Sequence, residues 1–261
     1  MNDIKKILTC AGSDPCGGAG IQADIKTISA FGHFAMSAIT AITAQNTMGV
    51  SGAEAVSPEM MKAQLDSVFT DIFPDSVKIG MLMNGKNADI IAERLNYYNA
   101  KNIVCDTVIM STSGRQLIDD EGLDIFIKKL MPFADVITPN IPEAERLCGM
   151  KINLPEDMEK AARLLSGMTK GAVLIKGGHL EGEALDILLC EGKLYNMTSP
   201  RIDNPNTHGT GCTLSSAIAC GLAEGRTVPE AAERAKKYIT KVISAGLAMG
   251  HGNGPMWHFA Q

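Results

Sequence analysis

The chain has 261 residues, of which 45% are hydrophobic and 20% charged, and its formal net charge is −5. This length can bury a sizeable core, and we expect a single domain over residues 1–261. The sequence has no run of basic residues, which excludes the electrostatic footprint of a protein that binds nucleic acid or an anionic membrane. A small-molecule partner is therefore expected, with no nucleic acid and no membrane.

The sequence contains no clear signal peptide, disulfide framework or zinc-binding motif. The first 12 residues hold a basic pair and only a short apolar run, too short for a signal peptide or a membrane span, so we expect a cytoplasmic protein. The seven cysteines form no C-x-x-C pair and are odd in number, which argues against a disulfide framework. The five histidines also lack zinc-ligand spacing, His251 and His258 being the closest pair.

The first half of the chain alternates strands with helices. Residues 5–11 read as an apolar strand that ends in the Gly-rich stretch 12–20, and a helix follows over 21–31. Residues 34–43 form the next strand and deliver residues 44–47 to a loop. Ser57 is expected to N-cap a helix over 58–73, residues 77–81 form a strand, and a helix begins at Asn84. The strand over 102–106 ends in the acid Asp106.

The second half continues this alternation. A helix is expected over 119–131, a strand over 135–138, and a helix that starts within 139–145, where Asn140 and Glu143 share a face. A helix over 156–165 precedes a strand over 172–175, and Lys176 begins the loop that follows this strand. Residues 185–190 and 193–197 read as an antiparallel hairpin, and the last helices span 212–224 and 228–249. This order predicts an α/β fold with a mostly parallel sheet covered on both faces, and with its polar loops along one edge.

The stretch Asn206–Ser216, NTHGTGCTLSS, is a Gly-rich turn that opens directly into a helix. Unpaired backbone N–H groups and the positive end of a helix dipole converge there, which is typical of a phosphate site. Gly209 and Gly211 let the backbone curl round a phosphoryl group, and Thr210 adds a hydroxyl donor. Cys212 falls at the helix start, where a thiol has a lowered pKa. An ordinary loop with a small buried cysteine is the alternative.

Other polar residues at strand ends have a ligand-binding and a plain interpretation. The glycines of residues 12–20 do not fit G-x-G-x-x-G, so a dinucleotide fingerprint is not predicted, and Gly12 and Asp24 belong either to a polar site or to a tight connection. Gln45 carries the donor and the acceptor needed to read an aminopyrimidine edge, or is simply solvated. Asp106 and the Asn140–Glu143 pair suit a metal ion or helix capping.

Taken together, these motifs resemble the hydroxymethylpyrimidine and phosphomethylpyrimidine kinases of thiamine biosynthesis, within the ribokinase-like group. The resemblance runs from Ile7 to His258 and is carried by AGSD and GGAGIQADIKT within 11–27, TAITAQNT at 40–47, KIGML at 78–82, TPNIPEAE at 138–145, IKGGH at 175–179 and THGTGCTLSSAIA at 207–219. It implies a three-layer α/β/α fold, ATP and Mg²⁺ as cofactors, and a pyrimidine alcohol as substrate. We also expect a homodimer.

The resemblance also implies roles for individual residues. Gly209, Thr210 and Gly211 would form the anion hole for the migrating phosphoryl group, and Cys212 would take the place of the aspartate base of related sugar kinases. The implied pyrimidine pocket consists of Gln45, Gly12, Ala19, Met81 and Val108, with Asp24 nearby. Lys176 and Lys241 would meet ATP, and Mg²⁺ would be organised largely through water by Asp106, Asn140 and Glu143.

The sequence departs from the family at Thr112, where many relatives carry lysine in an Ala-Lys-Ser-Gly run. Either Arg115 substitutes for that cation, or turnover depends more on Mg²⁺ and Lys176. Three functions stay open: a kinase for the pyrimidine alcohol and its monophosphate, a vitamin B6 kinase on the same scaffold, and a ligand-binding protein without the chemistry. Gln45 favours the pyrimidine, because a pyridoxine ring offers a phenolic oxygen in place of an N–H donor beside a ring-nitrogen acceptor.

Overall fold

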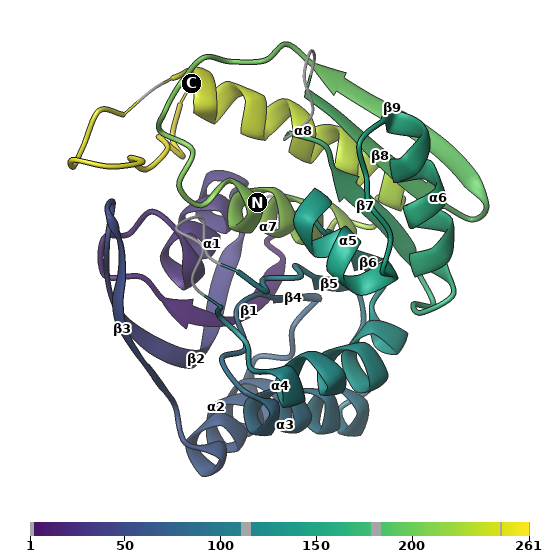
Figure 1. Cartoon of the computed structure of the whole chain (residues 1–261). Coiled ribbons are helices and arrows are strands. Elements are labelled where there is room, and N and C mark those ends of the chain that lie inside the picture. The colour runs from purple at the N-terminus through teal and green to yellow at the C-terminus, as the bar shows by residue number, and fades with distance from the viewer. Residues whose placement is uncertain (1–2, 111–115, 179–183, 246, 261) are drawn as a thin grey trace.

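The computed structural model describes residues 3–110, 116–178, 184–245 and 247–260. Within these ranges the strands form one nine-stranded sheet of order β3-β2-β1-β4-β5-β6-β7-β8-β9 (Figure 1). The strands from β2 to β7 in this order are parallel, whereas β3, β8 and β9 are antiparallel to their neighbours. Their bounds are β1 Lys6–Ser13, β2 Phe34–Asn46, β3 Gly49–Ala55, β4 Ser76–Ile79, β5 Ile103–Cys105, β6 Val136–Ile137, β7 Ala172–Lys176, β8 Ala184–Cys190 and β9 Lys193–Ser199.

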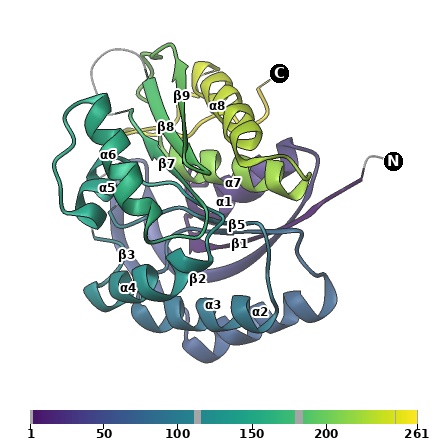
Figure 2. The ribbon, with the colours of Figure 1, turned by 90° about the vertical axis from the view of Figure 1, so that its right-hand side faces the viewer.

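Helices cover both faces of this sheet, and Figure 2 shows α2, α3 and α4 on the side opposite α1, α7 and α8. The helix that begins with α4 continues as a π-helical turn, Phe126–Leu130, and a 3₁₀ turn, Met131–Phe133. The α-helices are α1 Gly20–Ala30, α2 Pro58–Asp71, α3 Gly85–Tyr97, α4 Asp120–Ile125, α5 Ile141–Cys148, α6 Pro155–Ser166, α7 Thr210–Ala223 and α8 Val228–Ser244.

The side chains of each strand alternate between two apolar layers, because successive residues of a strand point to opposite faces. In β1, Leu8 packs in the layer that includes residues of α2, α3, α5 and α6, whereas Ile7 packs with α1, α7 and α8. Both residues are fully buried. The predicted three-layer α/β/α arrangement with a mostly parallel sheet is confirmed.

Local capping chemistry sets several helix starts where the sequence predicts them. The Ser57 hydroxyl accepts a hydrogen bond from the N–H of Met60, and the Asn84 side chain accepts one from Asn87. Side-chain caps of this kind satisfy N–H groups that have no partner within the first turn of a helix. The predicted hairpin is also present as β8 and β9.

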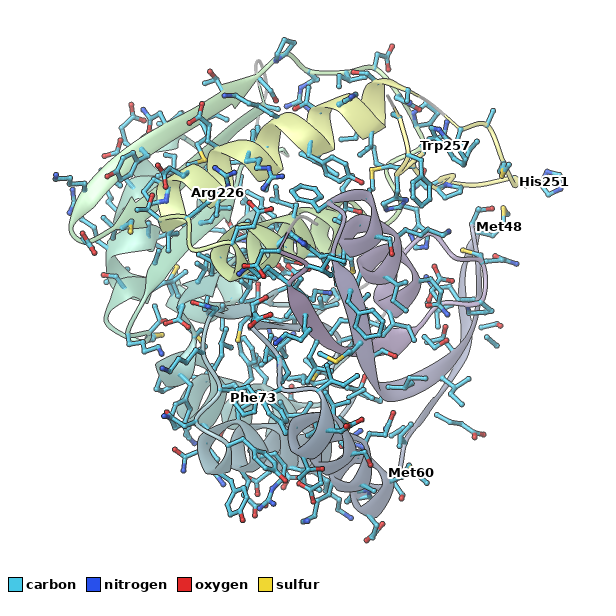
Figure 3. The ribbon with its side chains drawn as sticks, turned by 180° about the vertical axis from the view of Figure 1, so that it is seen from behind. Met48, Met60, Phe73, Arg226, His251 and Trp257 are labelled. Atoms are coloured by element: carbon cyan, nitrogen blue, oxygen red, sulfur yellow. The ribbon has the colours of Figure 1, made fainter. Side chains whose placement is uncertain are left out.

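Two expectations about the chain path are wrong. Residues 44–46 are not a loop, because β2 runs on to Asn46 and pairs with β3, a strand that was not predicted. The last helix ends at Ser244 and not at Met249. The chain beyond it returns to the β2–β3 turn, where the backbone N–H of His251 donates to Thr47 Oγ1 over 3.1 Å. Figure 3 shows His251 and Met48 side by side at this corner. None of the described helices has the length and apolar character needed to cross a membrane.

Candidate active site

The N-terminus of α7 is built on a glycine with a left-handed backbone. Gly209 is the N-cap, with φ of 85°, and a Cβ at this position would lie 1.9 Å from the carbonyl oxygen of Gly18. Only glycine therefore allows this turn to pack so closely against the loop that follows β1. The helix begins at Thr210, and by position the N–H groups of Gly211 and Cys212 have no intrahelical acceptor.

Asp106 and Lys176 form an ion pair directly beside this helix start. Asp106 follows β5 and Lys176 ends β7, and Lys176 Nζ lies 2.9 Å from Asp106 Oδ1. A Cβ on Gly211 would lie 3.3 Å from both Asp106 Oδ2 and Lys176 Nζ, so the first turn of α7 faces the pair and leaves no room there for a larger side chain. Burial alone would raise the pKa of Asp106, but the positive charges of Lys176 and Lys78 outweigh it and hold that pKa below its usual value.

Asn140 and Glu143 form the capping box of α5. The Asn140 side-chain oxygen accepts from the Glu143 N–H, and Glu143 Oε2 accepts from the Asn140 N–H, both at 2.9 Å. The Thr107 hydroxyl also donates to Glu143 Oε2. Burial raises the pKa of Glu143 and the Asp106 carboxylate adds to this rise, while Lys176 opposes it. A further cation would therefore be favourable beside this carboxylate.

The oxygen donors at this place suit Mg²⁺, which prefers carboxylates and retained water. Among the described residues, Ser215 Oγ at 3.3 Å is the hydrogen-bond partner of Asp106 Oδ2. The one hydrogen of this hydroxyl is also within reach of the Gly211 and Cys212 carbonyl oxygens, so Oδ2 keeps lone pairs for a metal-bound water. Glu143 Oε2 has two donors, so a metal-bound water would use the other oxygen of this carboxylate. The site therefore offers acidic oxygens, a lysine and a helix N-terminus within one cluster, which is the combination that phosphoryl transfer requires.

Asp24, which is expected near the pyrimidine pocket, forms an ion pair with Lys78 of β4. Its two carboxylate oxygens both lie 2.9 Å from Lys78 Nζ, and it also accepts bonds from the hydroxyls of Thr9 and Ser216. The side chains of Asp24 and Lys78 are completely buried. Sequence reasoning assigned Lys78 no role, although a lysine within the apolar strand 77–81 was the available signal.

The predicted lowering of the Cys212 pKa is wrong. Cys212 is half-buried, and this burial raises the pKa of its thiol to about 11, although Lys78 and the backbone N–H of Gly20 act in the opposite direction. The carboxylates of Asp24 and Asp106 reinforce the rise. The helix N-terminus is present as expected, but burial together with two nearby carboxylates has the larger effect. Cys212 is therefore a neutral thiol near pH 7.

Three residues of the predicted pyrimidine pocket lie together. A Cβ on Gly12 would lie 2.3 Å from Met81 Cε, so these two residues are in direct contact. Met81 packs in a small apolar cluster with Ala41 and Leu117, and Val108 packs against that cluster. Ala19 is the N-cap of α1 and lies against Gly209, since a Cβ on Gly209 would be 3.1 Å from Ala19 Cα.

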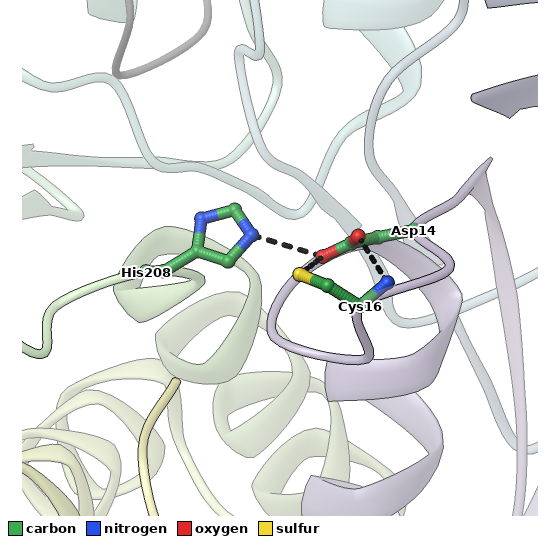
Figure 4. Close-up of side chains that lie close together, drawn as sticks. All are labelled: Asp14, Cys16 and His208. Atoms are coloured by element: carbon green, nitrogen blue, oxygen red, sulfur yellow. Dashed lines mark hydrogen bonds and ion pairs between the residues drawn. The ribbon is translucent and has the colours of Figure 1, made fainter. Parts of the chain in front are cut away.

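Gln45 joins this region through a histidine that the sequence did not single out. The terminal amide of Gln45 lies 3.2 Å from His208 Nε2, and His208 Nε2 lies 2.9 Å from Asp14 Oδ2. Figure 4 shows Asp14 between His208 and Cys16, whose thiol donates to the same carboxylate. Asp14 also receives the N–H groups of Gly18 and Ala19, so it ties the β1 loop to the turn before α7.

Two predicted features stand apart from this cluster. Lys241 is exposed on α8, and within the described part of the chain its side chain makes no hydrogen bond or ion pair with the other predicted residues. Thr112 and Arg115 lie outside the described residues.

Comparison with known proteins relates this geometry to a family. A family model described as phosphomethylpyrimidine kinase matches residues 14–257. A hydroxymethylpyrimidine/phosphomethylpyrimidine kinase from Streptomyces coelicolor is 44% identical over 252 residues, which cover 97% of this chain and 93% of that protein. The thiamine biosynthesis bifunctional protein ThiED from Geobacter sulfurreducens is 47% identical over 97% of this chain, which spans only 52% of that protein.

Solved structures agree with this result. The crystal structure of phosphomethylpyrimidine kinase from Clostridium difficile 630 has a TM-score of 0.82 at 46% identity, covering 92% of this chain and 99% of that one. Pyridoxal kinase from Staphylococcus aureus, in complex with AMP-PCP and pyridoxal, has a TM-score of 0.89 at 33% identity, covering 98% of this chain and 94% of that one. The fold is ribokinase-like, and the chain belongs to the phosphomethylpyrimidine kinase family.

Proposed function

We propose that this protein is a single-domain kinase that transfers the γ-phosphoryl group of ATP to 4-amino-5-hydroxymethyl-2-methylpyrimidine and then to the resulting monophosphate. The Asp106–Lys176 ion pair beside the first turn of α7 carries the proposal, since a Cβ on Gly211 would lie 3.3 Å from both partners. It joins a helix N-terminus, a lysine and a carboxylate at one point. Phosphoryl transfer depends on such positioning and charge stabilisation more than on covalent chemistry.

The polar and charged groups of this site would bind different parts of the nucleotide and its metal ion. The N–H groups at the start of α7, around Gly209, Thr210 and Gly211, point to the migrating phosphoryl group, and Lys176 neutralises its charge from β7. Asp106 and Glu143 would hold Mg²⁺ through water, with Asn140 keeping Glu143 in place by the capping box. When bound, this ion supplies charge neutralisation between the phosphates of ATP. Exposed Lys241 is assigned to the outer part of the nucleotide.

Cys212 is assigned to the substrate hydroxyl. In the first reaction the alcohol must lose a proton, and the thiolate of Cys212 accepts it as general base. A pKa of about 11 makes this thiolate a minor species at neutral pH, so the first reaction should accelerate as the pH rises. In the second reaction the nucleophile is a phosphate monoester, whose second pKa is about 6. This group is already mostly dianionic at pH 7 and needs no base.

The pyrimidine is placed between Gln45 and the apolar contact of Gly12, Met81 and Val108, with Ala19 on the side of α7. Gln45 offers its amide to the amino group and the neighbouring ring nitrogen. A vitamin B6 kinase is the second candidate, because a pyridoxal kinase that binds pyridoxal has the same fold at 33% identity. Identity to the pyrimidine kinases is higher, at 44–47% in the relatives above, which favours the pyrimidine.

A product assay tests this proposal. Purified protein, ATP and MgCl₂ are incubated with the pyrimidine alcohol, its monophosphate or pyridoxal, and the products are separated. We expect mono- and diphosphate from the alcohol, and diphosphate from the monophosphate. Phosphorylation of pyridoxal alone would overturn the pyrimidine assignment in favour of the vitamin B6 kinase.

Single-turnover rates then test the role of Cys212. Cys212→Ser should slow the first reaction by roughly 10²-fold or more and the second much less, because only the alcohol needs a base. Cys148→Ser, a half-buried thiol at the end of α5, is the matched control and should leave both rates unchanged. Equal losses in both reactions would show that Cys212 positions the phosphoryl group and does not act as base.

Two further proposals concern assembly and location. We expect a homodimer formed through the edge strand β3 and the neighbouring apolar side chains of Ile42 and Met48, which are 62% and 67% exposed. Light scattering during size-exclusion chromatography would give the mass directly.

All seven cysteines lie in described positions and are free thiols, which supports a reducing compartment such as the cytoplasm.

A further inference from the structure

His208 lies between the amide of Gln45 and the carboxylate of Asp14, and its place is closely defined. Its ring packs on the backbone of Gly18, where an added Cβ would lie 2.4 Å from Cδ2 of the ring. The backbone N–H of His208 donates to the carbonyl oxygen of Gly254, and this bond fixes the turn before α7. The side chains of His208 and Asp14 are 11% and 3% exposed. This imidazole therefore has little freedom to move.

The position of Asp14 decides which ring nitrogen carries the proton. Burial alone would raise the Asp14 pKa, but hydrogen bonds from His208, Cys16 and backbone N–H groups outweigh it and lower the pKa to about 2. An ionised carboxylate only accepts hydrogen bonds, so His208 Nε2, which lies 2.9 Å from it, must carry a hydrogen. The same nitrogen then has no lone pair to accept a bond from the amide of Gln45.

The Thr43 hydroxyl determines which atom of the Gln45 amide can face it. The Thr43 hydroxyl has one hydrogen, and the carbonyl oxygen of Ser13 accepts it over 2.8 Å. The oxygen of that hydroxyl lies 3.3 Å from the second terminal atom of the Gln45 amide and can only accept there. The structure places the Gln45 nitrogen toward His208 and its oxygen toward Thr43, and a half-turn about the last side-chain bond exchanges the two. After this exchange the single Nε2 hydrogen of His208 is shared between the Asp14 carboxylate and the Gln45 oxygen in a three-centre bond, and the Gln45 nitrogen donates to Thr43.

This orientation leaves a defined edge for a ligand. Gln45 is half-buried, and after these two bonds its oxygen keeps one lone pair and its nitrogen one hydrogen. A 4-aminopyrimidine presents an N–H donor beside a ring-nitrogen acceptor, which pairs with this edge. A 4-oxopyrimidine presents a carbonyl acceptor beside an N–H donor, so it needs the amide turned by half a turn.

We propose that the Asp14–His208 pair, together with Thr43, fixes the amide of Gln45 in one orientation and thereby selects 4-aminopyrimidines over 4-oxopyrimidines. His208 is thus a positioning residue that sets specificity without touching the substrate. The inference rests on the proposed function, in that it takes Gln45 as the group that meets the pyrimidine edge.

Binding of two probes to the full chain tests this inference. The probes are 4-amino-5-hydroxymethyl-2-methylpyrimidine and its counterpart with an oxo group in place of the amine, and the readout is the ratio of their dissociation constants by calorimetry. For the natural sequence we expect a ratio of about 100-fold or more in favour of the amine, because the oxo probe leaves two buried polar groups mispaired. His208→Leu should reduce this ratio at least about tenfold, since the amide can then turn freely.

Three further variants separate the possible causes. His208→Gln keeps a donor near the position of Nε2 and should retain most of the ratio. His251→Leu changes an exposed histidine at the β2–β3 corner and should leave the ratio unchanged. Thr43→Val removes the acceptor on the other side of the amide at nearly constant volume, and it should also lower the ratio. This variant decides the question if His208→Leu does not fold.

An unchanged ratio in His208→Leu, or in Thr43→Val where the former does not fold, would overturn the inference. Gln45→Leu keeps this result distinct from the substrate assignment. If Gln45→Leu binds the aminopyrimidine as well as the natural sequence does, then the amide does not meet the pyrimidine and both ideas fail. If binding weakens in Gln45→Leu while the ratio is unaffected in His208→Leu, only the role of His208 is lost.

Discussion

Replacement of Lys78 by methionine should destabilise the fold far more than replacement of any exposed lysine. Lys78 Nζ lies 2.9 Å from both carboxylate oxygens of Asp24, and the side chains of both residues are 0% exposed. Methionine has a similar length, so the change mainly removes the charge. Among the described residues, the Asp24 carboxylate would then keep the hydroxyls of Thr9 and Ser216, at 2.6 and 2.8 Å, as its hydrogen-bond donors.

The expected magnitude follows from the cost of an unpaired buried charge. Loss of one partner from a buried ion pair costs about 3–5 kcal/mol of unfolding free energy. The ordinary stability of a domain is only about 5–15 kcal/mol, so Lys78→Met should come close to unfolding the protein. Removal of the remaining charge in the double variant Lys78→Met/Asp24→Asn should recover part of the loss, because a neutral amide is much less costly to bury and can still accept bonds from both hydroxyls.

Urea unfolding followed by circular dichroism provides the measurement. Lys128→Met is the control, because Lys128 Nζ also lies 2.8 Å from a carboxylate, that of Asp124, but the two side chains are 70% and 66% exposed. An exposed pair of this kind contributes about 0–1 kcal/mol. If Lys78→Met costs less than about 1 kcal/mol, or no more than Lys128→Met, the reasoning about the buried pair is refuted.

Two other changes should give equally clear results. Gly211→Ala should reduce turnover much more than stability, because the new methyl would lie 3.3 Å from Asp106 Oδ2 and from Lys176 Nζ, where the phosphoryl group is placed. Parallel losses of turnover and stability would contradict this expectation. Gly167→Ala is the control, because its Cβ would meet nothing closer than 3.4 Å. Stability should also fall in acid through Glu224: burial would raise its pKa, but Arg234, Arg226 and His33 lower it from 4.5 to about 2. Its contribution is therefore complete above pH 4.5 and is lost as the pH falls toward 2, by up to about 3 kcal/mol. Unfolding free energies of the natural chain and of Glu224→Gln, compared between pH 6 and pH 3, measure this loss, and equal acid sensitivity of the two proteins would count against it.

Much of the fold was predictable from the sequence because it depends on interactions between near neighbours. Ser57 and Asn84 begin their helices by bonding N–H groups three residues later, and the spacing is visible in one dimension. The Gly-rich turn at 209–211 required glycine for the same local reason, since Gly209 adopts a left-handed backbone. The regular alternation of apolar strands and helices was sufficient to predict a mostly parallel sheet between two helical layers.

Features of the site that depend on residues far apart in the sequence were not predicted, or were predicted with the opposite sign. Nothing in the sequence of residues 44–46 indicates that β2 continues through them, because their strand pairing is with the partner strand β3. The link from Asp14 through His208 to Gln45 joins residues up to 194 positions apart. Proximity of this kind carries no periodic signal in a single sequence.

The sequence by itself determined the order of the helices and strands apart from β3, the starts of the capped helices, and which end of the sheet holds the polar side chains. Only the tertiary structure decided the charge states there. Cys212 lies at the predicted helix N-terminus, yet its pKa is raised to about 11 because packing partly buries the thiol beside two carboxylates. Lys78 is tolerated in the core because Asp24, 54 positions away, neutralises it. Electrostatic free energy depends on distances and on access of water in three dimensions, and neither is set until the chain has folded.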